Sequence, residues 1–295
     1  MITLFHTGFS TGVDGPGQRL VLYFKGCNLH CPWCAAPESI APAPEVLFYP
    51  QRADDPALLA AACPFGAVAL QSGTMRRDTA RCRRCADTPC ARSGCHAFER
   101  VGEQRSVADL RQLARRYYPF FHPDGGVTVG GGEPTCQFEE LARLLTALRT
   151  DGIHTALETN GTHPRLAELY PVLDLLYIDF KHPDDIACMR ITGAGNTVVL
   201  QNIRQRLAVG GGMVVRLPLV QGYNTDEGTL QQFGAILAAI GPVTVELLPF
   251  HPRGAVKWKA CGQTMPAQPL PVPPRGLAQA RAILAGCGLK LTKSD

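Results

Sequence analysis

The chain has 295 residues, of which 45% are hydrophobic and 18% are charged, and its formal net charge is +4. This length allows one large domain or one domain with an inserted module, and the composition is that of an ordinary globular protein. The net charge is too small to indicate binding to nucleic acid or to an anionic membrane. No apolar run reaches the length of a membrane span and the N-terminal residues lack a secretory pattern, so we expect a cytoplasmic protein.

Short β-rich runs alternate with helical stretches over most of the chain, which favours an α/β fold with a parallel sheet and right-handed crossovers. The first strand is predicted at residues 20–24, and a proline-rich linker at 265–274 leads into the last helix. Ligands of such folds bind beyond the carboxyl ends of the strands. The later predicted strands are 127–129, 155–158, 175–180, 213–220, 243–250 and 290–292, and the predicted helices are 138–148, 164–170, 198–208, 226–240 and 275–286.

Three cysteines directly after the first predicted strand carry the strongest functional signal. Cys27, Cys31 and Cys34 have the spacing C-x3-C-x2-C, with no fourth cysteine nearby. A four-iron cluster normally takes four thiolates, so three thiolates leave one iron open to a ligand. A zinc site or a redox pair is the alternative, although structural zinc usually has paired C-x2-C spacings and four ligands. The isolated cysteines are expected to pack as small apolar residues, and they are Cys136, Cys188, Cys261 and Cys287.

Residues 44–104 interrupt the alternation and are predicted to form an inserted module. A bacterial two-cluster ferredoxin repeats C-x2-C-x2-C-x3-C-P, and the fourth cysteine of each run binds the other cluster. Here Cys63-Pro64 matches the end of such a run, but the three earlier positions of that run do not hold cysteine. We therefore predict a single insert cluster, with Cys63 as its fourth ligand. Cys95 is the alternative fourth ligand. The alternative for the whole insert is a small zinc-binding module. The other three predicted ligands are Cys82, Cys85 and Cys90.

The insert also contains many arginines, which favours one of two interpretations. They form a docking face for an acidic electron donor of the flavodoxin or ferredoxin type. Alternatively, they are solvated residues that offset the negative charge of a thiolate-bound cluster. These arginines are Arg76, Arg77, Arg81, Arg83, Arg84 and Arg92.

A series of motifs in a fixed order resembles the glycyl radical enzyme activating enzymes, typified by the pyruvate formate-lyase activating enzyme, within the radical S-adenosylmethionine (SAM) superfamily. The resemblance extends almost from end to end of the chain. It implies a partial (β/α)6 TIM-type barrel over residues 1–43 and 105–295, with a ferredoxin-like insert at 44–104. The motifs are DGPGQR (14–19), KGCNLHCPWC (25–34), PES (37–39), VTVGGGEP (127–134), ALETNG (156–161), YIDFKH (177–182), VVRLPLVQGYN (214–224) and VELLPFH (245–251).

The resemblance implies a specific reaction. Cys27, Cys31 and Cys34 would hold a [4Fe–4S] cluster whose open iron is chelated by the amino and carboxylate groups of S-adenosylmethionine. Reductive cleavage would give a 5′-deoxyadenosyl radical that abstracts hydrogen from a glycine of a partner glycyl radical enzyme. With the insert cluster, two clusters are expected. The alternatives are a radical SAM enzyme acting on a small molecule or another protein site, and a non-catalytic iron–sulfur electron carrier.

The resemblance also assigns residues to the SAM site. Gly131, Gly132 and Glu133 would accept hydrogen bonds from the ammonium group, although a glycine run is also a common turn. Lys181 and Arg216 would pair with the methionine carboxylate, or else form structural ion pairs. The remaining expected site residues are Trp33, Asp179, Glu158 (near a monovalent cation) and His251 (near the adenosyl group). The departures from the family pattern are Gly130, Ala35 and Ala36.

Overall fold

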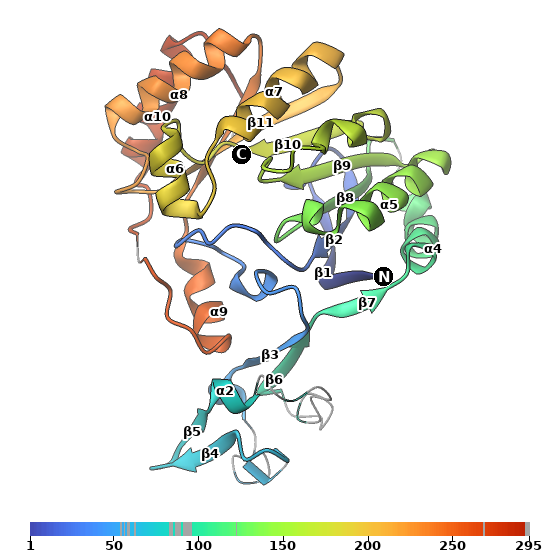
Figure 1. The fold of residues 1–295 in the computed structure, drawn as a ribbon, viewed down its shortest axis with the longest axis vertical. Coiled ribbons are helices and arrows are strands. Elements are labelled where there is room, and N and C mark those ends of the chain that lie inside the picture. The colour runs from blue at the N-terminus through green and yellow to red at the C-terminus, as the bar shows by residue number, and fades with distance from the viewer. Residues whose placement is uncertain are drawn as a thin grey trace.

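A nine-stranded sheet forms the body of the protein in this computed structural model (Figure 1). The strand order is β13-β12-β11-β10-β9-β8-β2-β1-β7, and every neighbouring pair from β2 to β13 is parallel. The structure describes residues 1–53, 55, 57, 60–61, 63–82, 85, 90, 96–121, 123–267 and 269–292. The strands of this sheet are β1 (Ile2–Thr11), β2 (Gln18–Phe24), β7 (Glu103–Arg105), β8 (Gly126–Gly131), β9 (His154–Thr159), β10 (Leu175–Asp179), β11 (Gly212–Leu219), β12 (Thr244–Pro249) and β13 (Lys290–Leu291).

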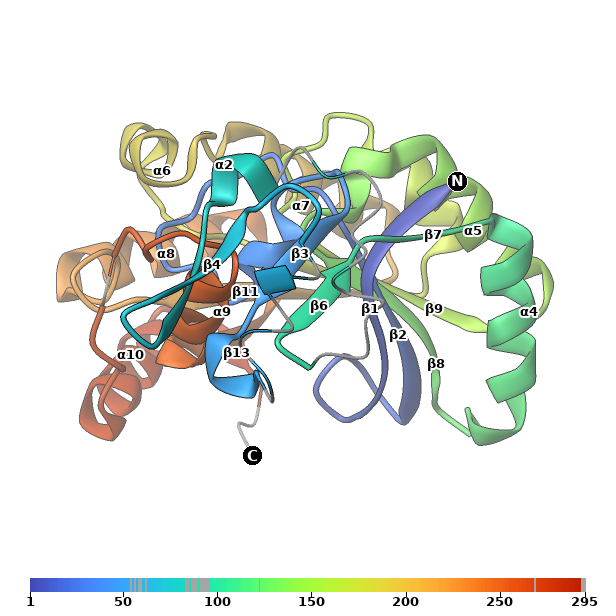
Figure 2. The same cartoon turned by 90° about the horizontal axis from the view of Figure 1, so that it is seen from below.

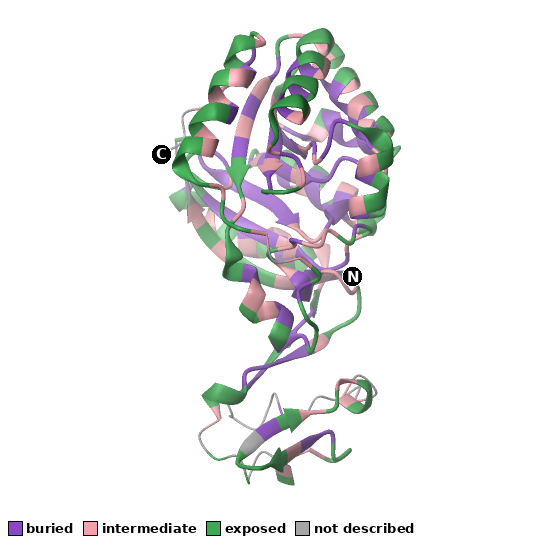
Figure 3. Cartoon of the chain, turned by 90° about the vertical axis from the view of Figure 1, so that its left-hand side faces the viewer, coloured by how far each residue is buried: buried purple, intermediate pink, exposed green. Residues whose placement is uncertain are grey.

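Helices cover the outside of the sheet and leave its strands buried between them (Figure 3). In α5, for example, Leu141, Leu144, Leu145 and Leu148 recur at helical spacing, and all four are buried in the main core. Within the described ranges, none of the helices has both the length and the apolar composition to cross a membrane. The helices of the body are α4 (Val107–Tyr117), α5 (Phe138–Thr150), α6 (Asp185–Thr192), α7 (Thr197–Val209), α8 (Glu227–Ile240), α9 (Ala255–Ala260) and α10 (Pro274–Gly286).

The predicted α/β alternation is confirmed. Each of the seven predicted strands overlaps an observed strand, from β2 and β8 to β13, and the predicted helices at 138–148, 198–208, 226–240 and 275–286 are α5, α7, α8 and α10. The stretch at 164–170 differs, because it is a 3-10 helix over Leu166–Val172 that contains Pro171. Proline lacks the N–H of an α-helical hydrogen bond, which accounts for the difference.

The prediction that residues 20–24 are the first strand is wrong, because β1 precedes them. β1 pairs antiparallel with β2, and β7 pairs antiparallel with β1, so this edge of the sheet is not parallel. Ile2 and Leu4 are buried, whereas the strand further on contains exposed positions such as His6 and Thr7. A half-buried antiparallel strand near the edge of the sheet lacks the continuous apolar run of a central parallel strand, so its pattern is weaker.

Residues between β3 (Glu45–Phe48) and β6 (Phe98–Val101) extend away from the body. β3 and β6 pair antiparallel with each other and lead to the hairpin of β4 (Val68–Gln71) and β5 (Thr74–Arg77). The short helix α2 (Thr79–Cys82) follows β5. Figure 1 shows these elements below the sheet, and in Figure 2 they face the viewer in front of it. The insert therefore joins the body through β3 and β6.

Candidate functional site

The cysteine loop, residues 25–36, follows β2 at the carboxyl edge of the parallel strands. Its start is fixed by hydrogen bonds from the Gly26 amide to the Ser39 carbonyl (2.7 Å) and from the Cys27 amide to the Ile40 carbonyl (3.0 Å). Its far end is fixed by α9, where the Trp258 indole donates to the Cys34 carbonyl at 2.9 Å. The loop that carries the three predicted cluster ligands is thus held at both ends.

The three thiols of this loop are partly covered by protein. Burial raises the pKa of Cys27 to about 12 and that of Cys34 to about 11, and it also raises the pKa of Cys31. The positive charge of Lys181 opposes this rise at all three thiols. The thiols are therefore protonated without a metal, and binding iron as thiolates would release their protons.

The donor set on this loop fits the chemistry of an open four-iron cluster, since three thiols lie within one short loop. In the part of the chain that the structure describes, however, no three His, Cys, Asp or Glu side chains already stand close enough to hold a metal ion. A four-iron cluster binds each thiolate through a different iron, so its ligands need not stand as close together as those of a single metal ion.

Lys181 and Asp179 lie beside these thiols at the end of β10. The Lys181 ammonium is 2.6 Å from the Asp179 carboxylate. Burial alone would lower the pKa of Lys181, but its ion pair with Asp179 opposes this effect and the pKa is raised overall. A partly buried ammonium next to the cysteine loop can stabilise negative charge, either on thiolates or on a ligand carboxylate.

Glu133 is buried, and both oxygens of its carboxylate accept hydrogen bonds from other residues of the protein. One oxygen accepts hydrogen bonds from the Thr135 amide (3.0 Å), the Thr135 hydroxyl (2.6 Å) and the Thr159 hydroxyl (2.7 Å). The other accepts from the Asn160 amide at 2.6 Å. Its backbone amide donates to the Gly26 carbonyl at 2.8 Å. Glu133 thus ties the ends of β8 and β9 to the cysteine loop.

Gly131 and Gly132 are constrained by packing. Gly131 has a φ of +128°, and a Cβ atom there would collide with the backbone of Phe24. A Cβ atom on Gly132 would lie 2.5 Å from the Gly26 carbonyl oxygen. Close backbone approach therefore accounts for both glycines, whether or not their backbone also binds a ligand.

Arg216 lies at the centre of a charged network across β9, β10, β11 and β12. Its guanidinium contacts the Glu158 carboxylate at 2.5 Å and the Glu246 carboxylate at 2.6 Å. It also stacks on Tyr177, 3.8 Å from the ring centroid. Burial raises the pKa of Glu158 to about 6, although Arg216 opposes the rise. The structure thus pairs Arg216 with two carboxylates of the protein.

Trp33 and His251 differ in their exposure to solvent. Trp33 is buried, with its ring 4.9 Å from that of Tyr223, in an apolar cluster that also contains Trp258. His251 is exposed in the segment after β12, where it lines a pocket of about 650 Å³ together with Ala35 and Ala36. Trp33 therefore supports the cysteine loop, and His251 stands where it can meet a ligand beside that loop.

The structure brings the predicted insert ligands together. Cys63, Cys82, Cys85 and Cys90 line one small cavity, beside Val46 of β3 and Phe98 of β6. The Cys63 sulfur accepts a hydrogen bond from the Ala67 amide at 3.3 Å. The other candidate for the fourth ligand, Cys95, lies outside the described residues, as do Arg83, Arg84 and Arg92.

Several residues of this region were not predicted from the sequence. Glu246 and Trp258 are two of them; they become recognisable only when strand register and the position of α9 are known. Glu38 is a third: its carboxylate is buried and pairs with Lys257 at 2.5 Å, and its second oxygen has no hydrogen-bond partner among the described residues. The PES motif that contains Glu38 was the available signal.

Comparison with known proteins supports the resemblance. The model of the radical SAM superfamily matches residues 21–233. The indoleacetate decarboxylase activating enzyme of Tractidigestivibacter scatoligenes is 32% identical over 271 residues, which cover 87% of this chain and 85% of that protein. The pyruvate formate-lyase 2-activating enzyme of Escherichia coli K12 is 32% identical over 287 residues, which cover 95% of this chain and 88% of that protein.

Solved structures agree with the fold. A radical SAM methyltransferase from Sphaerobacter thermophilus matches 97% of this chain and 68% of its own, with a TM-score of 0.54 and 14% sequence identity. At this identity the likeness concerns the fold alone. It supports the mostly parallel sheet and its helical cover.

Proposed function

Because the chain belongs to the radical SAM superfamily, and within it to the glycyl radical enzyme activating enzymes, we propose that it activates a partner enzyme by generating a glycyl radical. The observation that carries this proposal is the position of the three-cysteine loop. It lies at the carboxyl edge of the parallel strands, tied to Glu133 and beside the Lys181–Asp179 pair. Ligands of parallel α/β folds bind at this edge.

In this proposal Cys27, Cys31 and Cys34 hold a [4Fe–4S] cluster, and the residues around the loop bind S-adenosylmethionine. When bound, the cluster and S-adenosylmethionine together supply a 5′-deoxyadenosyl radical that removes a hydrogen atom from a glycine of the partner. Lys181 neutralises the methionine carboxylate, and its buried contact with Asp179 keeps it charged and oriented.

The charged network has a separate part in the proposal. Arg216 is held by Glu158 and Glu246, so it orients those carboxylates as well as offering its own charge to the ligand. Glu158 is the carboxylate proposed to lie near a monovalent cation next to S-adenosylmethionine. His251 would contact the adenosyl group from the segment after β12.

We further propose that residues 1–43 and 105–295 form the catalytic body and that residues 44–104 carry one ferredoxin-like [4Fe–4S] cluster. The cavity shared by Cys63, Cys82, Cys85 and Cys90 supports the crossed ligand set. A flavodoxin- or ferredoxin-type carrier would supply the electron. The named activating enzymes among the relatives have different partners, so the identity of this partner is left to experiment.

The proposal is tested anaerobically. Reduced protein is mixed with S-adenosylmethionine and the candidate glycyl radical enzyme, and the mixture is examined by electron paramagnetic resonance (EPR). We expect a glycyl doublet that is absent when Cys27, Cys31 and Cys34 are replaced by alanine. The absence of a doublet, with 5′-deoxyadenosine formed only on addition of a small molecule, would contradict the proposal and favour a small-molecule enzyme.

A further inference from the structure

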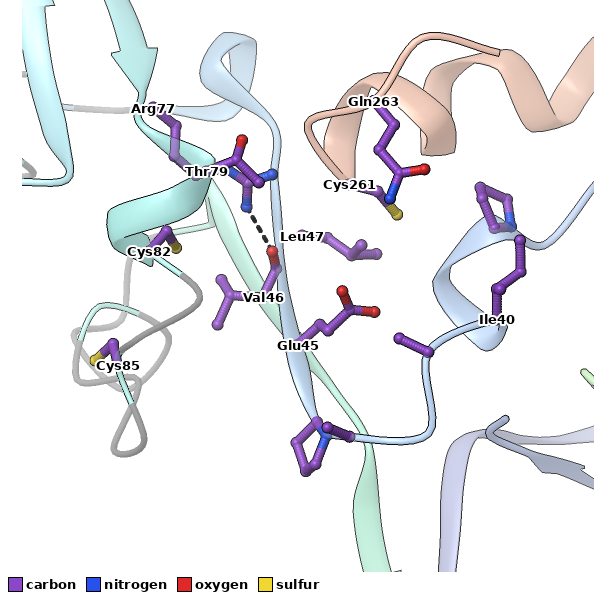
Figure 4. A pocket seen from close by; sticks show the side chains of 14 residues that line it. Ile40, Glu45, Val46, Leu47, Arg77, Thr79, Cys82, Cys85, Cys261 and Gln263 are labelled. Carbon is purple, nitrogen blue, oxygen red and sulfur yellow. Dashed lines mark hydrogen bonds between the residues drawn. The ribbon is translucent and has the colours of Figure 1, made fainter. Parts of the chain in front are cut away.

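Among the described arginines of the insert, only Arg77 donates a hydrogen bond to the catalytic body. It ends strand β5, and its side chain points toward β3 and α9 (Figure 4). One guanidinium nitrogen donates to the Val46 carbonyl at 2.6 Å, and another donates to the Ala260 carbonyl at 2.8 Å. Its neighbour Arg76 is exposed. The two adjacent arginines therefore have different surroundings despite their identical charge.

Arg77 also lies beside a predicted cluster ligand. Cys82 lies on α2, five residues further along the chain, and Figure 4 shows both side chains at the same cavity. This cavity has a volume of about 340 Å³, and Cys85 lines it as well. Burial raises the pKa of the Cys82 thiol, and the positive charge of Arg77 opposes this rise. Arg77 thus places a positive charge beside Cys82 from the side of this cavity.

Helix α9 connects this contact with the cysteine loop. Trp258 in α9 donates to the Cys34 carbonyl at 2.9 Å, and Ala260, two residues later, accepts from Arg77. The approach is close, since a Cβ atom on Gly262 would lie 2.9 Å from the Arg77 guanidinium. The same short helix therefore contacts the loop of one proposed cluster and the arginine beside the other.

We propose that Arg77 is a positioning residue that holds the insert against α9 and stabilises the reduced state of the insert cluster through its positive charge at the cavity that it shares with Cys82. This inference rests on the insert cluster of the proposed function. Reduction moves one electron from a reduced flavodoxin- or ferredoxin-type carrier into the cluster, with no bond formed or broken. Hydrogen bonds to ligand sulfurs and nearby net charge set the reduction potential of such clusters, so a fixed guanidinium at Cys82 raises it.

The test uses the full chain with Cys27, Cys31 and Cys34 replaced by alanine, so that only the insert cluster remains. Its midpoint potential is measured by redox titration followed by EPR. In Arg77→Gln we expect about a tenfold fall in the ratio of reduced to oxidised cluster at a fixed potential, which is about 59 mV for one electron. Arg76→Gln removes the same charge from the exposed neighbour and is expected to shift the potential much less.

An unchanged potential in Arg77→Gln, or an equal shift in Arg76→Gln, would overturn the inference. If Arg77→Gln fails to retain iron, the midpoint potential of Arg77→Lys is measured instead. Lysine keeps the positive charge but not the planar set of N–H donors, so we expect a smaller negative shift of the potential. An unchanged potential in Arg77→Lys, or loss of iron in both variants, would overturn the proposed role in reduction. The redox titration contains neither a partner enzyme nor S-adenosylmethionine. Its result is therefore independent of whether the glycyl radical assay of the proposed function succeeds. No iron in the parent variant would instead reject the insert cluster.

Discussion

Gly130 lies so close to Glu158 that a Cβ atom at position 130 would come within 2.6 Å of the Glu158 Oε2 atom. The family pattern usually has serine at this position, and this chain combines glycine there with a glutamate on the neighbouring strand. We expect Gly130→Ala to lower the free energy of unfolding by about 1–3 kcal/mol, because the added atom overpacks the buried Glu158–Arg216 pair. Chemical denaturation under anaerobic conditions measures this change.

A double-mutant cycle identifies the cause. Glu158→Asp shortens the side chain by one methylene, so Gly130→Ala should cost less in that background than in the original chain. Gly286→Ala is the matched control, because a Cβ atom there meets nothing within 4 Å. Equal costs of Gly130→Ala in both backgrounds would show that contact with Glu158 is not the reason for glycine.

Glu133 should tolerate even an isosteric change poorly. Each of its carboxylate oxygens accepts a hydrogen bond from a backbone amide, of Thr135 on one side and of Asn160 on the other. Glu133→Gln places an NH2 group against one of these N–H donors, so we expect a loss of about 1–3 kcal/mol in unfolding free energy. Glu139→Gln, on an exposed side chain, is expected to change stability by about 0.5 kcal/mol or less. Similar values for the two variants would refute this role.

The ligand set of the insert cluster is tested by iron content. We expect about eight irons per reconstituted chain, from two four-iron clusters. Cys63→Ala should retain only about four, whereas Cys95→Ala should retain about eight, because Cys63 shares a cavity with the other three predicted ligands. The reverse pattern would assign the fourth ligand to Cys95, and about four irons in the unmodified chain would reject the insert cluster.

The contact between α4 and α5 should depend on pH. Asp151, directly after α5, accepts two hydrogen bonds each from Arg111 and Arg115, and these hold its pKa well below the usual range. A carboxyl group whose pKa is lowered in the folded state stabilises the fold at pH values above its ordinary pKa of about 4. This stabilisation is lost as the pH falls below that value. We therefore expect Asp151→Asn to destabilise the apoprotein at pH 7 and somewhat less at about pH 3.

Denaturation of both proteins at the two pH values measures this effect. Asp78→Asn is the control, because the one ion pair of Asp78 within the described residues, with Arg81, is exposed. This control should change little at either pH. A constant difference between Asp151→Asn and the unmodified chain across the range would contradict the assignment.

The central strands could be predicted from the sequence because each contains a short run rich in buried apolar residues. β1 could not, because only part of it is buried. Helix α4 had a recognisable signal that was overlooked: Ser106 and Asp109 form a reciprocal capping box at its start. Short sequence patterns were thus sufficient to predict those strands and helices whose burial stays the same along their length.

The site was only partly predictable for a different reason. The motifs identify Lys181 and Arg216, but the pairing of Arg216 with Glu246 depends on the register of β11 and β12. Likewise, no local pattern distinguishes Arg76 from Arg77, although only Arg77 faces β3 and α9. Contacts between distant segments are set by packing, and a single sequence does not display them.

The central claim is that this chain removes a hydrogen atom from a glycine of a partner protein. The most direct test is to prepare the candidate partner with glycine deuterated at the α-carbon and to analyse the 5′-deoxyadenosine by mass spectrometry. The account predicts deuterium in 5′-deoxyadenosine, in proportion to the glycyl radical seen by EPR, and none with a partner whose radical-site glycine is replaced by alanine. 5′-Deoxyadenosine that contains no deuterium while the glycyl radical accumulates would contradict it.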